Sequence, residues 1–174
     1  MVAGVWTMTE RSGNEIYGMV LRAARGAQLP LAHAQDLAAA CRWLGGDLSQ
    51  IVEALETAQD PNGVALSVPG IIDIALANPG RPQTLDNPSP KALIAALCKE
   101  AACRHQCQIE LTVSQDTATV CASDGPTPNG PKSARASIDA AIWDKLGAWA
   151  ARTYVPESEA SRLSGAGAGL HDND

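Results

Sequence analysis

The residues best suited to chemistry gather in the last part of the sequence, where hydrogen-bond donors precede a run of alternating glycine and alanine. Guanidinium and hydroxyl groups donate hydrogen bonds to anions, and alternate glycines let successive backbone N–H groups face one anion. No Gly-Lys-Ser/Thr triplet follows the run, so it is not a P-loop. We predict that this segment completes a site for a small anion. The predicted ligand-binding residues are Arg152, Tyr154, Ser161, Arg162, Gly165, Gly167 and Gly169.

Three cysteines and a histidine lie close together in the segment Cys98-x4-Cys103-Arg-His105-Gln-Cys107. An α-helix turns by about 100° per residue, so His105 would face away from Cys103, and no paired Cys-x-x-Cys is present. We therefore predict small buried cysteines here and no zinc site. A nucleophilic cysteine would need a base, and nothing in the spacing selects one among His33, His105 and His171.

The sequence closes on His171, Asp172 and Asp174, whose side chains are of the types that bind divalent cations. A solvated chain segment is the alternative, and no metal site is predicted from them. No known cofactor motif is present, so the cofactor is left unknown and no reaction can be named.

Arginines also mark the first part of the chain. Arg22 and Arg25 are three residues apart and share one face of a predicted helix, while Arg42 ends the next helix. If the two helices pair, these guanidinium groups would line one rim of a cleft. A solvent-exposed basic face is the simpler interpretation.

The bulk composition limits the classes of protein that remain. A chain of 174 residues with 45% hydrophobic residues predicts one folded domain, and its alanine-rich, phenylalanine-free interior gives weight to Trp143 and Trp149 as anchors. The net charge of −6 argues against nucleic acid as a partner. No apolar run approaches the ~20 residues of a membrane span and no signal peptide is seen. Five irregularly spaced cysteines favour the reducing cytoplasm.

The elements that position these residues follow from hydrophobic periodicity and turn signals. Helices are predicted over 15–27, 30–44, 47–58, from 89 onward and from 139 to before Pro156, and residues 108–113 and 117–121 predict a β-hairpin. Residues 132–138 are a candidate third strand, 78–90 a loop, and 64–77 either a helix or a strand pair. The predicted fold is α+β: a mostly helical single domain with a small antiparallel sheet. Its predicted divisions are a flexible N-terminus 1–12, the domain 13–155 and a docked tail 156–174.

Two stretches carry a resemblance to a known family. The helical opening runs from Asn14-Glu15-Ile16 through Ala23-Ala24-Arg25-Gly26-Ala27 to Ala40-Cys41-Arg42-Trp43-Leu44, and the closing stretch is Thr153-Tyr-Val-Pro-Glu-Ser-Glu-Ala-Ser-Arg-Leu-Ser-Gly-Ala-Gly-Ala-Gly-Leu-His-Asp-Asn-Asp174. They resemble an uncharacterised, mainly proteobacterial family known as a domain of unknown function. The resemblance brackets most of the chain but implies no activity, ligand or catalytic residue.

Two functions remain open from the sequence. The first is a bacterial cytoplasmic protein that binds a small anionic metabolite at a site completed by the tail. The alternative is a non-catalytic accessory or homo-oligomeric structural protein, in which the tail is a docking arm whose acids anchor on Arg22 and Arg25 of a neighbouring subunit.

Overall fold

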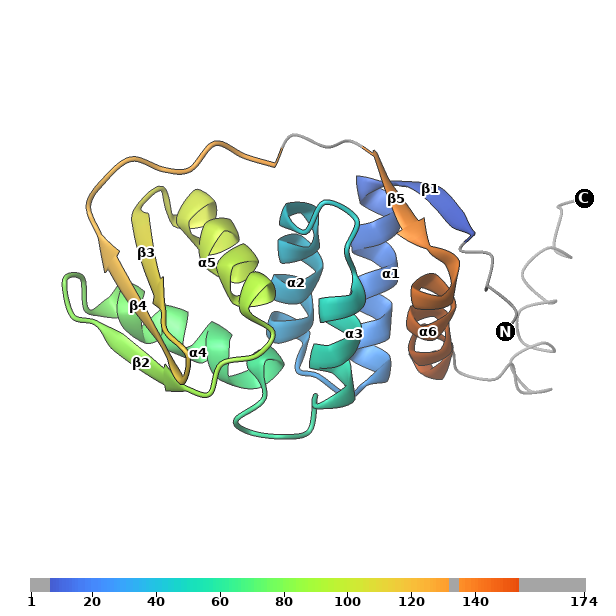
Figure 1. Ribbon diagram of the computed structural model, residues 1–174, viewed down its shortest axis with the longest axis horizontal. Helices are drawn as coiled ribbons and strands as arrows, with labels where there is room; N and C mark the ends of the chain where they lie inside the picture. Colours follow the sequence, from blue (N-terminus) through green and yellow to red (C-terminus); the bar gives the residue numbers. More distant parts are fainter. Residues whose placement is uncertain (1–6, 132–134, 154–174) are drawn as a thin grey trace, which may run out of the picture.

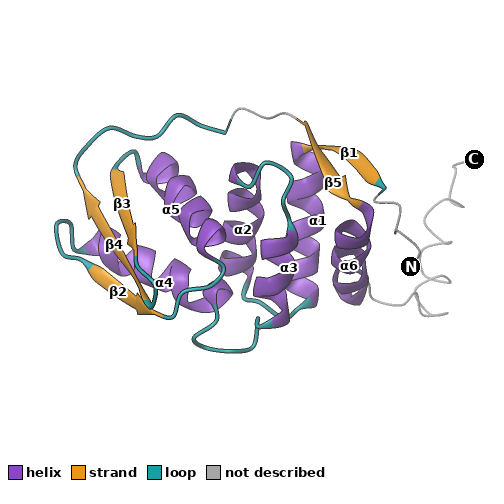
Figure 2. Ribbon diagram, in the orientation of Figure 1, coloured by secondary structure: helices purple, strands orange, loops and turns teal. Residues whose placement is uncertain are grey.

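Helices fill the middle of the molecule, and a small antiparallel sheet lies toward each end (Figures 1 and 2). The computed structural model describes residues 7–131 and 135–153. The predicted α+β class, mostly helical with a small antiparallel sheet, is confirmed. In chain order the elements are β1 (Met8–Ser12), α1 (Gly13–Gly26), α2 (Leu31–Ala40), the 3-10 helix η1 (Cys41–Trp43), α3 (Ser49–Glu56), α4 (Val64–Ala77), β2 (Gln83–Asp86), α5 (Lys91–His105), β3 (Gln108–Val113), β4 (Thr117–Ser123), β5 (Arg135–Asp139), α6 (Ala140–Ala150) and the 3-10 helix η2 (Ala151–Thr153).

Helix α1 begins with a complete capping box. The backbone N–H of Glu15 donates to Ser12 Oγ, and the Glu15 carboxylate accepts from the Ser12 backbone N–H at 2.8 Å. Both bonds satisfy N–H groups that a helix start leaves without intrahelical partners. Ile16, Val20 and Ala23 lie on one buried stripe of this helix. Burial of this stripe leaves the other face of the helix exposed, and that face contains Arg22 and Arg25.

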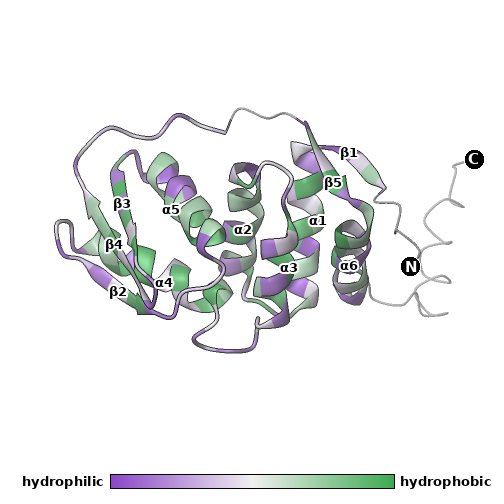
Figure 3. Ribbon diagram, viewed as in Figure 1, coloured by the Kyte–Doolittle hydropathy of each residue, from purple (hydrophilic) through white to green (hydrophobic). Residues whose placement is uncertain are grey.

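Small residues dominate the interior, as the composition predicts. The fully buried set combines a few large aliphatic side chains, such as Leu37, Ile51 and Leu93, with many alanines. Small side chains let helices approach closely, which is why α1 packs directly against both α2 and α6. Helix α4, which Figure 3 colours mainly as hydrophobic, packs against α5 and the sheet.

The predicted hairpin is confirmed as β3 and β4, which pair antiparallel from Gln108–Ser123 to Val113–Ala118. The third strand of this sheet is β2, which pairs with β4. The prediction of a loop over 78–90 is therefore wrong for Gln83–Asp86. Pro82 and Pro88 lie on either side of this four-residue strand. Prolines are typical of turns, so the sequence pattern predicted a loop where a short edge strand forms.

Strand β5 does form where a third strand was suspected, but it pairs with β1 and not with the hairpin. Its partner spans Met8–Ser12, so the prediction of a flexible N-terminus over 1–12 is wrong for these residues. Residues 1–6 lie outside the described part. A two-stranded pair between distant segments has no local sequence signal, because each strand is short and polar.

The ambiguous segment 64–77 is one helix, α4, with Pro69 inside it. Ile72 and Ala75 are buried with Val68, which matches helical and not strand periodicity. Trp143 and Trp149 are half-buried and pack against the core from its edge, so they are less central than predicted. Arg11 lies over the Trp143 ring at 4.7 Å.

Candidate functional site

The exposed face of α1 presents Arg22 and Arg25 one helical turn apart. Arg25 lies in the last turn, where Nη1 donates to the carbonyl oxygen of Leu29 at 2.9 Å. This bond holds the side chain across the turn that follows the helix. It also places a cation near the C-terminal carbonyls, where the helix dipole favours positive charge.

Gly26 brings a distant part of the chain to the same place. A Cβ at this position would lie 1.8 Å from the carbonyl oxygen of Trp149, so only glycine allows the backbones of α1 and α6 to approach this closely. Because η2 follows α6 directly and packs against α1, Arg152 arrives beside the end of α1.

The result is an open groove of about 680 Å³ between the end of α1, the start of α2 and η2. We call it the arginine groove. It has three guanidinium groups, and among residues 7–131 and 135–153 no carboxylate, histidine or cysteine lines it. Its lining residues are Leu21, Arg22, Arg25, Gly26, Gln28, Leu31, Arg152 and Thr153.

The three arginine side chains are exposed. Over residues 7–131 and 135–153, Arg25 bonds only to a backbone oxygen, and the side chains of Arg22 and Arg152 have no hydrogen bond or ion pair. Guanidinium groups stay protonated at physiological pH and form planar, paired hydrogen bonds with carboxylates and phosphates. The arrangement can hold an anion by charge and by direct donation.

Helix α2 adds to this electrostatic environment. It begins at Leu31 in the groove, and no side chain caps its first backbone N–H groups. The N-terminal end of a helix carries a partial positive charge that favours anions nearby.

Arg42 does not line the groove, and the idea that it shares a rim with Arg22 and Arg25 is wrong. Its Nη2 lies 3.0 and 3.1 Å from the two carboxylate oxygens of Glu100. Trp43 Nε1 donates to the same carboxylate at 2.8 Å. Glu100 is only 8% exposed, and burial of a carboxylate requires such partners. Four residues further along α5, Arg104 pairs with Asp36 at 2.6 Å.

Of the predicted ligand-binding residues, the structure describes Arg152 and places it in the arginine groove. Tyr154, Ser161, Arg162, Gly165, Gly167 and Gly169 lie outside the described residues, as do His171, Asp172, Asp174 and the predicted docking of the tail. Arg22 and Arg25, which the sequence indicated as the rim of a possible cleft, line the groove as well, whereas Leu21, Gly26, Gln28, Leu31 and Thr153 were not predicted. A signal existed in Gly26, the last residue of α1, because a glycine lets another backbone approach closely.

The cysteines are free and differ in burial. Burial raises the pKa of both Cys41 and Cys98 to about 12, so they are protonated and inert at neutral pH. Cys103 Sγ donates to the carbonyl oxygen of Pro128 at 3.2 Å. Within the described residues no group of three or more His, Cys, Asp or Glu side chains could hold a metal ion.

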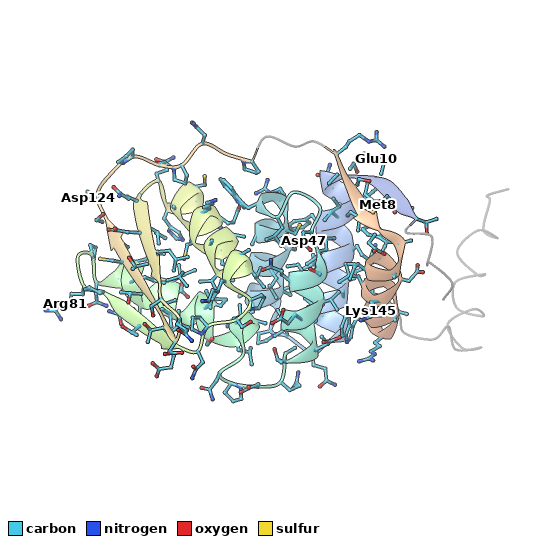
Figure 4. All side chains as sticks on the ribbon, viewed as in Figure 1. Met8, Glu10, Asp47, Arg81, Asp124 and Lys145 are labelled. Atoms are coloured by element: carbon cyan, nitrogen blue, oxygen red, sulfur yellow. The ribbon has the colours of Figure 1, made fainter. Side chains whose placement is uncertain are left out.

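A second shallow depression brings His105, Cys107 and Asp124 together at the sheet end of the molecule, where Figure 4 labels Asp124. Burial and the nearby Asp124 carboxylate raise the pKa of Cys107. A raised pKa reduces the thiolate fraction that a nucleophile needs. This constellation therefore lacks the activated thiol of a catalytic cysteine.

The described part of the chain contains no helix both long and apolar enough to span a bilayer. The resemblance to a domain-of-unknown-function family stays a prediction. Comparison of the chain with protein-family models, with curated proteins and with solved structures found no match.

Proposed function

We propose that this protein binds a small anionic ligand in the arginine groove. The observation that carries the proposal is the gathering of Arg22, Arg25 and Arg152 around one groove, which no carboxylate of the described residues lines. The chain has 19 acidic residues against 13 Lys and Arg, yet none of the acids in the part that the structure describes lines this groove. Three neighbouring cations repel one another, and an anion between them would remove that repulsion.

The proposal concerns binding, because the described part of the lining offers no carboxylate, histidine or cysteine to act as base or nucleophile. The sequence-based expectation that residues 154–174 complete the site belongs to this proposal. Thr153 supports it, since this residue lines the groove and the chain continues directly from it.

A cytoplasmic location is also part of the proposal, since free cysteines persist in a reducing compartment. The net charge of −6 argues against nucleic acid as the anion.

The test is a ligand screen on the full chain with inorganic phosphate, pyrophosphate and small carboxylates, followed by thermal unfolding. A ligand at 100 times its dissociation constant stabilises by about 2.7 kcal/mol. We expect Arg22→Gln combined with Arg152→Gln to weaken binding at least tenfold. Arg81→Gln is the matched control, because Arg81 is exposed at the opposite end of the molecule (Figure 4). Equal losses in both variants would show that general charge, and not the groove, attracts the anion.

A second candidate is the docking arm of an accessory or homo-oligomeric protein. It is favoured by charge: residues 154–174 contain Glu157, Glu159, Asp172 and Asp174 against Arg162 alone, and they follow Thr153 at the groove. In this case the groove of one subunit would take the acidic segment of another. Replacing the four acids by their amides would then lower the association state in light scattering. An unchanged association state, with anion binding intact, would leave the first candidate.

A further inference from the structure

The arginine groove contains apolar surface as well as charge. Leu31 is 54% exposed and is one of four large apolar side chains with high exposure in the described residues. Leu21 is half-buried and precedes Arg22 on α1. Both leucines line the groove together with the three arginines. A bare inorganic anion would leave this apolar surface in contact with water.

The turn between α1 and α2 fixes this apolar surface beside the cations. The backbone N–H of Leu29 donates to the carbonyl oxygen of Ala24 at 3.0 Å, and the Leu29 side chain is fully buried. Gln28 adopts a left-handed conformation with φ of 69°, which reverses the chain so that α2 begins at once. Leu31 is therefore held at the groove by an anchored turn.

The volume of the groove supports a ligand larger than phosphate. Sites for small organic molecules measure about 300–1,000 Å³, whereas one water occupies about 30 Å³ of the liquid. At about 680 Å³ the groove falls in the range of organic ligands. Gln28 and Thr153 add an amide and a hydroxyl that can hydrogen-bond the polar part of such a ligand.

We infer that the groove takes an amphipathic organic anion, in which a carboxylate or phosphate contacts the arginines and an alkyl or aryl substituent covers Leu21 and Leu31. The inference rests on the proposed anion-binding function and names the ligand class of that site. Apolar contact adds binding free energy in proportion to the area removed from water, and a fully buried methylene raises the affinity about fourfold. In an open groove, about twofold per methylene is expected.

The experiment compares inorganic phosphate with butanoate, hexanoate and octanoate below micellar concentrations, by chemical-shift titration of the full chain. We expect affinity to rise about twofold per added methylene. Leu31→Ser should abolish most of this increase without changing the affinity for phosphate. Ile74→Ser is the matched control, since Ile74 is 49% exposed on α4 and does not line the groove. Arg22→Gln should weaken phosphate and carboxylates alike by about tenfold.

Each outcome decides between distinct explanations. If phosphate binds but chain length and Leu31→Ser have no effect, the amphipathic ligand is wrong while the anion site stands. If neither phosphate nor any carboxylate binds, the proposed function itself fails. A last arm uses vesicles of anionic phospholipid. Sedimentation with vesicles without binding of free carboxylates would overturn the small-ligand inference in favour of a membrane surface.

Discussion

Arginines occupy two contrasting environments in this molecule. On α5 and its neighbours, Arg42 and Arg104 pair with Glu100 and Asp36 at 3.0 and 2.6 Å. At the end of α1, three arginines share a groove that no carboxylate lines within the described residues. We refer to the first set as the paired arginines. The paired arginines join separate elements, because Glu100 on α5 receives hydrogen bonds from two residues of η1.

The difference separates charge that is paired within the fold from charge that has no acidic partner among the described residues. A buried carboxylate such as Glu100 is costly unless it is bonded, so its partners belong to folding. Exposed guanidinium groups contribute little to stability, and bringing three of them together is mildly unfavourable. An arrangement that folding alone does not favour is more readily explained by binding.

The largest expected effect is that of Gly26→Ala. The new Cβ would meet the Trp149 carbonyl at 1.8 Å, and a backbone neighbour cannot rotate away as a side chain could. We expect a loss of about 3 kcal/mol in urea unfolding, because α1 and α6 must separate. Gly18→Ala on the same helix meets nothing within 4 Å and should instead stabilise by about 0.5–1 kcal/mol. Equal effects of the two substitutions would mean that α1 and α6 do not cross at Gly26.

The next effect tests the paired arginines. Glu100→Gln removes the carboxylate charge that accepts hydrogen bonds from Arg42 and Trp43. We expect the free energy of unfolding to fall by about 2 kcal/mol, and not by more, because Arg42 is half-exposed. The control is Glu56→Gln, since Glu56 makes an exposed pair with Lys145 at 3.8 Å and should cost less than about 0.5 kcal/mol. Chemical denaturation of the two variants would measure both losses. If the two variants cost the same, the Glu100 cluster is not a structural clamp.

Alkaline pH should destabilise the molecule through two buried thiols, Cys41 and Cys98. Cys41 precedes Arg42, and Cys98 shares α5 with Glu100. Burial raises both pKa values from 9.0 to about 12. Between pH 9 and 12 the unfolded chain loses these protons while the folded chain keeps them. The contribution of the two thiols to the free energy of unfolding is therefore fully present below pH 9. Above pH 9 it falls by up to about 1.4 kcal/mol per thiol and pH unit.

The measurement is the slope of the unfolding free energy between pH 9 and 11. Cys41→Ala with Cys98→Ala should flatten this slope. A slope that the double variant does not change would place the alkaline sensitivity elsewhere.

The smallest effect concerns the stability contribution of the groove. Arg22→Gln should change stability by no more than about 0.5 kcal/mol, and it should stabilise at low salt because repulsion from Arg25 and Arg152 is relieved. High salt should remove the gain, since exposed charges are screened. Arg81→Gln should show no such salt dependence. A loss above about 1 kcal/mol for Arg22→Gln would show that this arginine is structural after all.

Much of the fold was predictable because its signals are local. The capping residues, the periodicity of α1 and α5, and the alternation in β3 and β4 all lie within short windows. The errors concern strands: β2 in a proline-rich stretch, and the pairing of β1 with β5. Short edge strands have few apolar residues, and their partners are chosen by packing.

The candidate site was predictable only in pieces. The sequence indicated Arg22 and Arg25 as neighbours and suggested Arg152 as a ligand-binding residue, but it gave no reason to join them. It also grouped Arg42 with Arg22 and Arg25, although Arg42 forms an ion pair with Glu100 on α5 and does not line the groove. Leu31 carried no signal, because an exposed leucine at a helix start is unremarkable on its own.

The sequence by itself determined which residues could be cationic neighbours, since helix geometry places positions three apart on one face whatever surrounds them. Only the tertiary structure decided which cations have a carboxylate partner among the described residues and which have none. The grouping of Arg152 with Arg22 and Arg25 depends on the contact at Gly26, where the missing side chain lets Trp149 and then Arg152 approach the end of α1. Such a contact between distant segments is set by close packing, and no local pattern encodes it.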